Sequence, residues 1–183
     1  RGSPGAPAAH APRPAPVPIA DQADLFSDRA IRTFALELPE GRWRRLREGA
    51  LEERWAAAVL TVEGARIGVV GVRFKGAAGT LAGCVRGGEV VCAKLPLKLR
   101  FDRYDAQRRL FGLSRINLHA MARDRSLLRE RLAYRVFERA GIPAPRTAWA
   151  RLVVNGKSIE QATLSNRDTI EVRGVKWVFR SAV

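Results

Sequence analysis

A glycine-rich segment between two predicted strands could bring backbone amides close to a phosphate. The segment is Lys75-Gly76-Ala77-Ala78-Gly79-Thr80. Nucleotide-binding loops use glycines in this way, because a missing side chain lets the amides reach phosphate oxygens. The spacing matches neither the Walker A pattern nor the dinucleotide fingerprint, so an ordinary hairpin loop is the alternative interpretation.

Two charged residues further along the chain extend the phosphate hypothesis. Lys98 lies in a predicted strand and Glu130 in the helix predicted after it. A protein-kinase amino-terminal lobe has the same order of glycine-rich loop, strand lysine and helix glutamate; the lysine holds phosphates and the glutamate orients the lysine. Alternatively, Lys98 lies on the solvated face of an edge strand and Glu130 pairs with a neighbouring arginine. The candidate cofactor-binding residues are Lys75, Gly76, Gly79, Lys98 and Glu130.

The chain has two cysteines, Cys84 and Cys92, on either side of Gly87-Gly88. A turn at the glycines could join the sulfurs across a hairpin tip, and a disulfide and two unpaired thiols both remain open. A disulfide would indicate an exported protein. No metal site is predicted, because His10 and His119 are too far along the chain to complete a ligand set with the cysteines. No catalytic triad or pair of carboxylates can be assembled, so the catalytic residues are unknown.

The chain is strongly basic, with 33 Lys and Arg against 18 Asp and Glu and a net charge of +15. Such a charge favours polyanions, including nucleic acid, nucleotide phosphates and anionic surfaces. Residues 100–139 alone hold eleven arginines and five acids. Their aromatic neighbours lie mostly at apolar-face positions and offer no base-stacking platform. A basic module that binds nucleic acid or acidic surfaces is the alternative function.

The length of 183 residues suits one domain, and it is too short for the two full lobes of a large enzyme. No apolar run is long enough to span a bilayer, which excludes a transmembrane function. The chain begins at Arg1 without a Met, and we expect it to be a processed or cut segment.

Hydrophobic periodicity predicts the elements that must position these residues. Strands are predicted over 31–38, 55–62, 67–74, 94–101, 147–154, 169–172 and 175–179, with a short helix ending near residue 46. The clearest strand is 94–101, which places apolar residues on one face, namely Leu95, Leu97, Leu99 and Phe101. Its other face carries Lys98 and Pro96, and the missing amide hydrogen of the proline indicates an edge strand or a bulge.

The best helix is predicted over 125–140, with Asp124 as N-cap and Gly141 as its left-handed stop. The pair Asn155-Gly156 predicts a hairpin turn. The fold class is therefore α+β, with a mainly antiparallel sheet and one long helix, like a kinase amino-terminal lobe.

Composition divides the chain into three parts. Residues 1–24 contain six of the ten prolines and predict a disordered linker. Residues 25–156 form the predicted folded region, and 157–183 a β-hairpin tail.

Over about residues 24–156 the chain resembles the CotH family of atypical kinases, which is named for a spore-coat protein. The matching segments, in order, are Asp24-Leu25-Phe26-Ser27-Asp28, residues 70–76, the loop from Cys84 to Cys92, residues 94–102, Ile116-Asn117-Leu118, residues 124–134, residues 140–146 and Val153-Val154-Asn155-Gly156. The resemblance implies a protein-kinase-like fold that phosphorylates protein serines with ATP and a divalent metal such as Mg²⁺. It also implies a protein substrate, a Cys84–Cys92 disulfide and an exported or cell-surface bacterial protein.

The sequence departs from the family pattern after Asn155-Gly156. The family continues with a Gly-Leu-Tyr strand, a glutamate-bearing hinge and a carboxy-terminal lobe with the metal-binding and catalytic aspartates. Residues 153–180 instead resemble the closing strands of a forkhead-associated domain or, more loosely, an S4-type RNA-binding hairpin. We therefore expect an incomplete kinase that is inactive alone. A structural fragment without a ligand is a further alternative.

Overall fold

The computed structural model describes residues 19–158, apart from Ala93, Arg123 and Arg125, and the backbone of two short strands beyond them. Most of the predicted linker and most of the predicted tail lie outside the described residues. Within the predicted linker, the short helix α1 (Gln22–Leu25) begins after its N-cap Asp21 and buries Leu25 in the core.

The main sheet has seven strands in the order β7-β6-β3-β2-β1-β8-β9. Their bounds are β1 (Arg32–Glu37), β2 (Ala56–Val62), β3 (Ala65–Phe74), β6 (Leu97–Arg100), β7 (Arg115–Leu118), β8 (Ala150–Val154) and β9 (Lys157–Ser158). Every pair is antiparallel except β1 with β8, which is parallel. The predicted α+β class with a mainly antiparallel sheet is confirmed.

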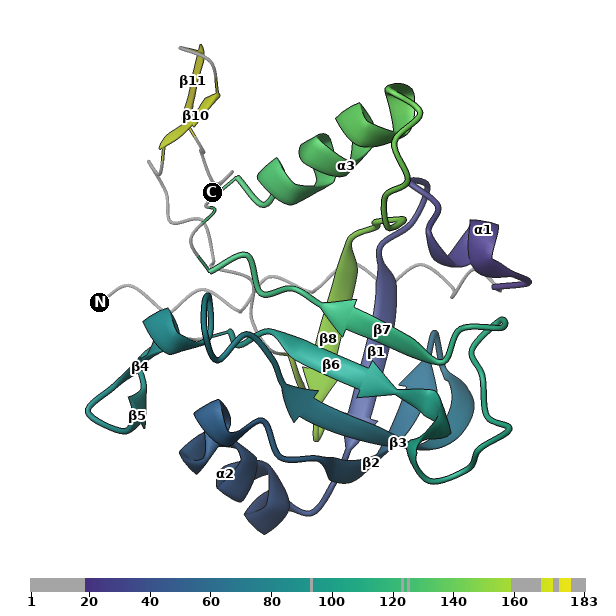
Figure 1. Ribbon diagram of the computed structural model, residues 1–183, viewed down its shortest axis with the longest axis vertical. Helices are drawn as coiled ribbons and strands as arrows, with labels where there is room; N and C mark the ends of the chain where they lie inside the picture. The colour runs from purple at the N-terminus through teal and green to yellow at the C-terminus, as the bar shows by residue number, and fades with distance from the viewer. Residues whose placement is uncertain are drawn as a thin grey trace, which may run out of the picture.

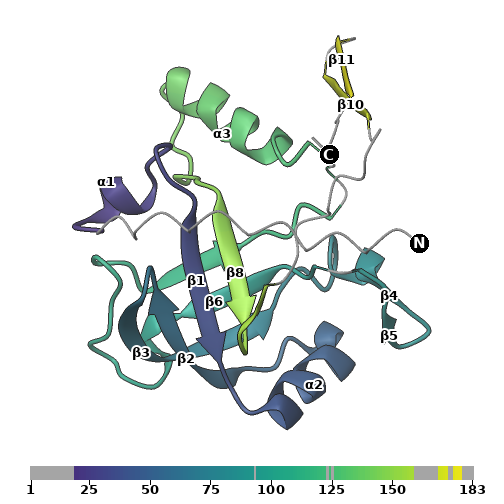
Figure 2. The same ribbon diagram turned by 180° about the vertical axis from the view of Figure 1, so that it is seen from behind.

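The core lies inside a curl of this sheet. Figure 1 shows β1 and β8 crossing behind β6 and β7, and Figure 2, seen from the other side, shows β1 and β8 in front. Alternation along each strand turns one side chain in two toward this interior, and the predicted apolar face of 94–101 is buried there. The fully buried side chains include Leu36, Leu60, Val70, Val72, Leu97, Leu99 and Phe101.

The interpretation of Pro96 as a residue of an edge strand or bulge is wrong. Strand β6 is paired on both sides, by β3 and by β7, and it begins one residue after the proline. Pro96 therefore needs no amide hydrogen for the ladder, and its carbonyl oxygen accepts a 3.0 Å hydrogen bond from the Lys75 amide.

The predicted short helix is present as α2 (Glu40–Glu48), followed by the 3-10 turn η1 (Ala50–Glu52). Leu46 is buried, and the Trp43 ring lies 5.6 Å from the Phe74 ring, so α2 packs against the core. Asn155 in the predicted turn fixes the start of this helix. Its side chain accepts from the Leu38 amide and donates to Glu40, both at 3.0 Å.

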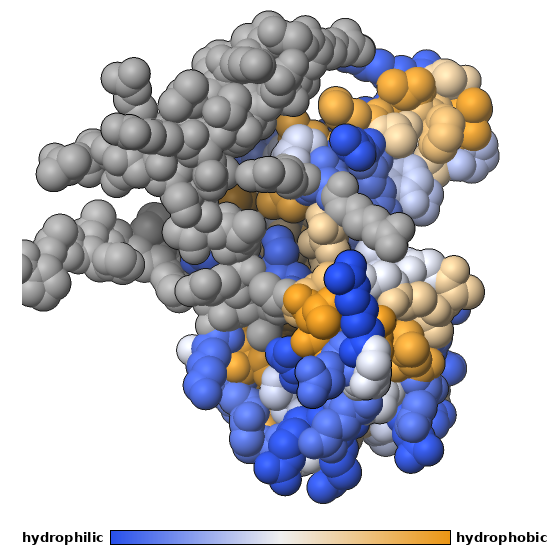
Figure 3. Space-filling model, turned by 90° about the vertical axis from the view of Figure 1, so that its left-hand side faces the viewer, coloured by the Kyte–Doolittle hydropathy of each residue, from blue (hydrophilic) through white to orange (hydrophobic). Residues whose placement is uncertain are grey.

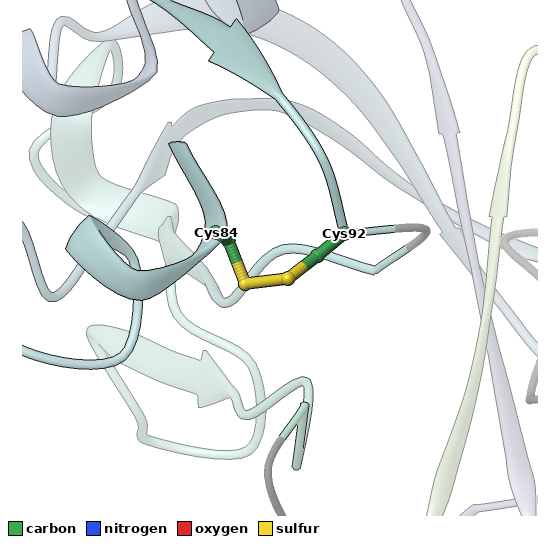
Figure 4. The surroundings of a disulfide bond; sticks show 2 residues. All are labelled: Cys84 and Cys92. Carbon is green, nitrogen blue, oxygen red and sulfur yellow. A yellow bond between two sulfur atoms is a disulfide. The ribbon is translucent and has the colours of Figure 1, made fainter. Parts of the chain in front are cut away.

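The connection from β3 to β6 contains a small disulfide-closed hairpin. Turn η2 (Ala82–Cys84) leads into β4 (Val85–Arg86) and β5 (Glu89–Val90), joined at Gly87-Gly88, where both glycines have positive φ. Cys84 and Cys92 form a disulfide across the base of this hairpin, with 5.0 Å between their Cα atoms (Figure 4). Of the two states that the sequence left open, the structure has the disulfide.

The long helix α3 (Arg129–Arg139) is shorter than the predicted 125–140. One oxygen of the Asp124 carboxylate accepts from the amide and the hydroxyl of Ser126, and the other accepts from the Arg129 amide at 2.8 Å. A turn therefore precedes the helix, and Leu127 in that turn has a positive φ of 55°. At the other end Gly141 has a φ of 69° and donates to the Glu138 carbonyl, as its predicted role as stop residue requires.

The apolar stripe of α3 faces away from the core. Leu132 is 56% exposed, Val136 61% and Phe137 42%. Figure 3 shows apolar side chains gathered in its upper part, where α3 lies above the sheet in Figure 1. The buried residue of this helix is Arg131, whose guanidinium pairs with Asp28, donates to the Thr147 carbonyl and lies 4.2 Å from the Trp149 ring centroid. Polar contacts rather than apolar packing hold the helix in place.

The predicted pair of strands around Arg173-Gly174 is present as β10 (Thr169–Val172) and β11 (Val175–Val178), which pair antiparallel. The remaining short element is the 3-10 turn η3 (Phe101–Arg103). No helix among the described residues is both long and apolar enough to cross a membrane.

Candidate functional site

One face of the sheet gathers positive charge from three adjacent strands. Arg73 lies directly opposite Lys98, and Arg100 opposite Arg115, in the antiparallel ladders of β3, β6 and β7. Side chains that are opposite each other in a ladder lie on the same face of the sheet. Val72 and Leu99, which adjoin these basic residues in sequence, point from the other face into the core. We call Arg73, Lys98, Arg100 and Arg115 the basic face.

Lys75 extends this face beyond the end of β3. Partial burial, and then the positive charge of Lys98, lower the pKa of Lys75. Arg73, two residues before Lys75, is opposite Lys98 in the ladder, so the two lysines lie on the same side of the sheet. The charges of Glu130 and Glu53 oppose the effect of Lys98 on the pKa of Lys75. Among the described residues Lys98 itself has no ion pair. An anion placed near both lysines would lower their mutual repulsion.

Glu130, the residue predicted to orient a lysine, is connected to Lys75 through His119. The Lys75 Nζ lies 3.1 Å from His119 Nε2, and His119 Nδ1 lies 2.9 Å from the Glu130 carboxylate. Partial burial lowers the pKa of His119, so the ring is neutral near pH 7. Burial, and then the negative charge of Glu130, raise the pKa of Tyr134. Lys75, His119 and Glu130 thus form one hydrogen-bonded chain from β3 to α3.

No hydrogen bond or ion pair joins Lys98 to Glu130, although the structure describes both side chains. The predicted kinase-like pair is therefore not in contact here. The alternative pairing of Glu130 with a neighbouring arginine is not seen either, because its carboxylate contacts His119. The structure places Lys75 on the same side of the sheet as Lys98 and connects Lys75 to Glu130 through His119.

The glycine-rich segment is a tight turn at the start of the long loop that joins β3 to its antiparallel neighbour β6, so it lies in a hairpin connection, as the alternative interpretation expected. The carbonyl of Gly76 accepts from the amides of Gly79 and Leu81, at 2.9 and 3.0 Å. Gly76 has a φ of 90°, which a residue with a side chain rarely adopts. The amides of Gly76 and Ala77 donate to the carboxylate of Glu53.

Sequence reasoning missed Glu53, His119 and Trp55. The Trp55 ring lies close to two guanidinium groups, 5.1 Å from that of Arg73 and 5.9 Å from that of Arg103. A side chain at Gly71 would collide with this stack, because a Cβ there would come within 2.9 Å of Arg103 Cβ. The positive charge of Arg73 is thus held against the sheet by Trp55 and Glu53.

A divalent metal does not fit the described residues. Nowhere in the described part of the chain do three His, Cys, Asp or Glu side chains come together in a way that could hold a metal ion. The basic face instead offers the donors that phosphate oxygens need.

A family model described as CotH kinase protein matches residues 72–174. This span is more than half of the chain and includes Lys75, Gly76, Gly79, Lys98 and Glu130. It continues beyond the Asn155-Gly156 turn, where the quoted motifs stop. No curated protein matches the chain.

Proposed function

Because the chain belongs to the CotH kinase family, we propose that its basic face binds the phosphates of ATP for transfer of a phosphoryl group to protein serine. The observation that carries the proposal is the placement of Lys75 and Lys98 on one side of the sheet, with Arg73 directly opposite Lys98. Keeping like charges close costs free energy unless an anion neutralises them. A polyphosphate has the charge and the acceptor oxygens to do so.

The neighbours of the two lysines support this assignment. Arg73 lies directly opposite Lys98 and has a fixed guanidinium, which suits a second phosphate. His119 accepts from Lys75 and Glu130 accepts from His119. In the proposal Glu130 is a positioning residue that acts on Lys75 through the imidazole. Kinases use a helix glutamate on a phosphate-binding lysine for the same purpose.

The described residues are proposed to bind and position the phosphates. No step of phosphoryl transfer is assigned to them. Kinases neutralise the developing charge with Mg²⁺ held by carboxylates. The described residues do not bring such carboxylates together.

Isothermal titration calorimetry on the whole chain tests the proposal, with ATP in the presence and absence of Mg²⁺. Lys98→Ala should weaken ATP binding by about tenfold or more, because it removes a charge-assisted contact. Lys157→Ala is the matched control, since Lys157 lies in β9 at the opposite edge of the sheet. Its affinity should equal that of the wild type. The absence of both heat and thermal shift with ATP would refute nucleotide binding.

The contacts of the arginines argue against binding of nucleic acid. Of the arginines in 100–139 that the structure describes, six form ion pairs with acids of the same chain. These six are Arg100, Arg108, Arg109, Arg129, Arg131 and Arg135. DNA or RNA affinity that falls steeply with salt, together with no affinity for ATP, would favour the nucleic-acid module instead.

We also propose that the chain is exported and acts on a protein substrate outside the cytoplasm. The disulfide supports export, because such bonds persist in oxidising compartments. Alkylation of the protein in intact cells, followed by mass spectrometry, should find Cys84 and Cys92 unmodified and bridged. Two alkylated thiols would refute export.

A further inference from the structure

The carboxylate of Glu53 occupies the start of the glycine-rich turn. Its Oε1 accepts from the Gly76 amide at 2.7 Å and from the Ala77 amide at 3.0 Å. Its Oε2 pairs with the Arg73 guanidinium. Two consecutive backbone amides and a guanidinium are the donors that proteins use for phosphate oxygens. A carboxylate with its two charged oxygens is a chemical stand-in for such a group.

The position of Glu53 is closely defined. The residue follows η1 with a left-handed φ of 52°, a conformation that costs free energy for a residue with a side chain. The Glu53 side chain is 24% exposed and the Arg73 side chain 19%. Hydrogen bonding from the Ala77 amide, helped by Arg73 and Gly76, holds the pKa of Glu53 below its ordinary value. The side chain is thus ionised at neutral pH and bound to three donors.

The same donors adjoin the proposed phosphate site. Arg73 belongs to the basic face, and Lys75 immediately precedes Gly76 in the chain. A phosphoryl group in the place of the Glu53 carboxylate would lie beside Arg73, which is opposite Lys98 in the sheet. Its entry would require Glu53 to leave.

We infer that the amides of Gly76 and Ala77 and the Arg73 guanidinium form an oxyanion site for a phosphoryl group, and that Glu53 occupies this site as an internal competitor. The inference rests on the proposed function for the neighbouring lysines, and it adds a competition that limits access to the same site. Removal of the carboxylate frees three donors at once. Affinity for a phosphate should then increase, whereas loss of an ordinary structural contact would leave it unchanged or lower it.

Calorimetric titration of the whole chain with inorganic pyrophosphate tests this inference. Glu53→Ala should bind pyrophosphate about tenfold more tightly than the wild type, because a charge-assisted competitor is gone. The matched control is Glu52→Ala, since Glu52 is the adjacent acid and pairs instead with exposed Arg54. This variant should bind as the wild type does. In ¹⁵N spectra the amide signals of Gly76 and Ala77 should move with pyrophosphate in Glu53→Ala.

A second variant keeps the test valid if Glu53→Ala does not fold. Glu53→Gln retains an acceptor for the amides and loses the charge, and its affinity should lie between those of Glu53→Ala and the wild type. A folded Glu53 variant with no gain in affinity, or with a gain that leaves the Gly76 and Ala77 signals unmoved, would overturn the inference.

The outcomes also separate this inference from the proposed function. Suppose that wild-type affinity for ATP is lost in Lys98→Ala while neither Glu53 variant gains affinity for pyrophosphate. The lysine site then stands and the competition by Glu53 is refuted. If Glu53→Ala binds pyrophosphate more tightly, with shifted Gly76 and Ala77 amide signals, but neither the wild type nor Glu53→Ala binds ATP, the oxyanion site stands and nucleotide binding fails.

Discussion

The side chains of Lys75 and His119 are joined by a hydrogen bond, with 3.1 Å between Nζ and Nε2. An ammonium group can only donate, so Nε2 is the acceptor and the proton of the neutral imidazole lies on Nδ1. That proton points to the Glu130 carboxylate, 2.9 Å away. Protonation of His119 would remove the acceptor and place a second positive charge beside Lys75.

The stability of the protein should therefore decrease in mild acid through His119. Burial holds the pKa of this ring below its ordinary value of 6.5. The unfolded chain consequently binds a proton at a higher pH than the folded one, and the free energy of unfolding falls as the pH drops below about 6.5. Denaturant unfolding between about pH 8 and about pH 5 should show this decrease in the wild type.

His119→Gln provides the comparison, since glutamine forms hydrogen bonds without titrating. Its free energy of unfolding should depend less on pH over the same range. Equal pH dependence in the two proteins, or an NMR titration that places the His119 pKa above 6.5, would contradict the expectation.

Gly71→Ala should destabilise the protein by about 1–3 kcal/mol, the usual cost of overpacking. A Cβ at this position would lie 2.9 Å from Arg103 Cβ and 3.0 Å from a carbon of the Trp55 ring. Neither atom is the free end of a flexible side chain. Thermal and denaturant unfolding would measure the loss.

Gly41→Ala is the control for that substitution. Gly41 lies in α2, and the nearest atom to a Cβ there is the flexible end of Arg45 at 3.7 Å. Alanine should stabilise this helix by about 0.5–1 kcal/mol. A Gly71→Ala protein as stable as the wild type would show that Trp55 and Arg103 can move apart.

Removal of the disulfide should lower the free energy of unfolding by about 2–3 kcal/mol, because a short closed loop restricts the unfolded chain. The double variant Cys84→Ala with Cys92→Ala tests this. A reductant should destabilise the wild type and leave the double variant unchanged. Identical melting of the wild type with and without reductant would contradict the prediction.

Polar substitutions on the stripe of α3 should have little effect on stability. Leu132→Ser and Val136→Ser remove apolar groups that are more than half exposed. Each should change the free energy of unfolding by less than about 1 kcal/mol. Leu36→Ala is the buried comparison, because Leu36 is 0% exposed and its truncation should cost about 2–5 kcal/mol. A loss at Val136 as large as that at Leu36 would show that the stripe is covered.

Local patterns were enough to predict much of the fold. The apolar face from Leu95 to Phe101 alternates along the strand, so the buried side of β6 could be predicted from the sequence. Asn155-Gly156 has the two positive φ values that its type of turn requires. In contrast, α3 begins only at Arg129, because one oxygen of Asp124 binds Ser126 and the other binds the Arg129 amide across a turn that the cap pattern does not predict.

The contacts of the candidate site could not be predicted in the same way. Lys75, His119 and Glu130 come from separate parts of the chain, and their meeting depends on the order of the strands. Glu53 binds amides more than twenty residues away, and its residue type gives no sign of them. Periodicity also predicted that α3 is amphipathic, but it could not show that the apolar side of this helix is exposed. These three features depend on contacts between residues that are far apart in the sequence.

The parallel pairing of β1 with β8 has a consequence for synthesis of the chain. Phe34 and Leu36 are opposite Leu152 and Val154, which leave the ribosome only after most of the domain has been made. Until then β1 presents one edge of unpaired amides and carbonyls, which other extended chains can join. Nascent chains that stall before residue 150 should therefore aggregate, and a chaperone that binds extended segments should associate with the protein during this interval.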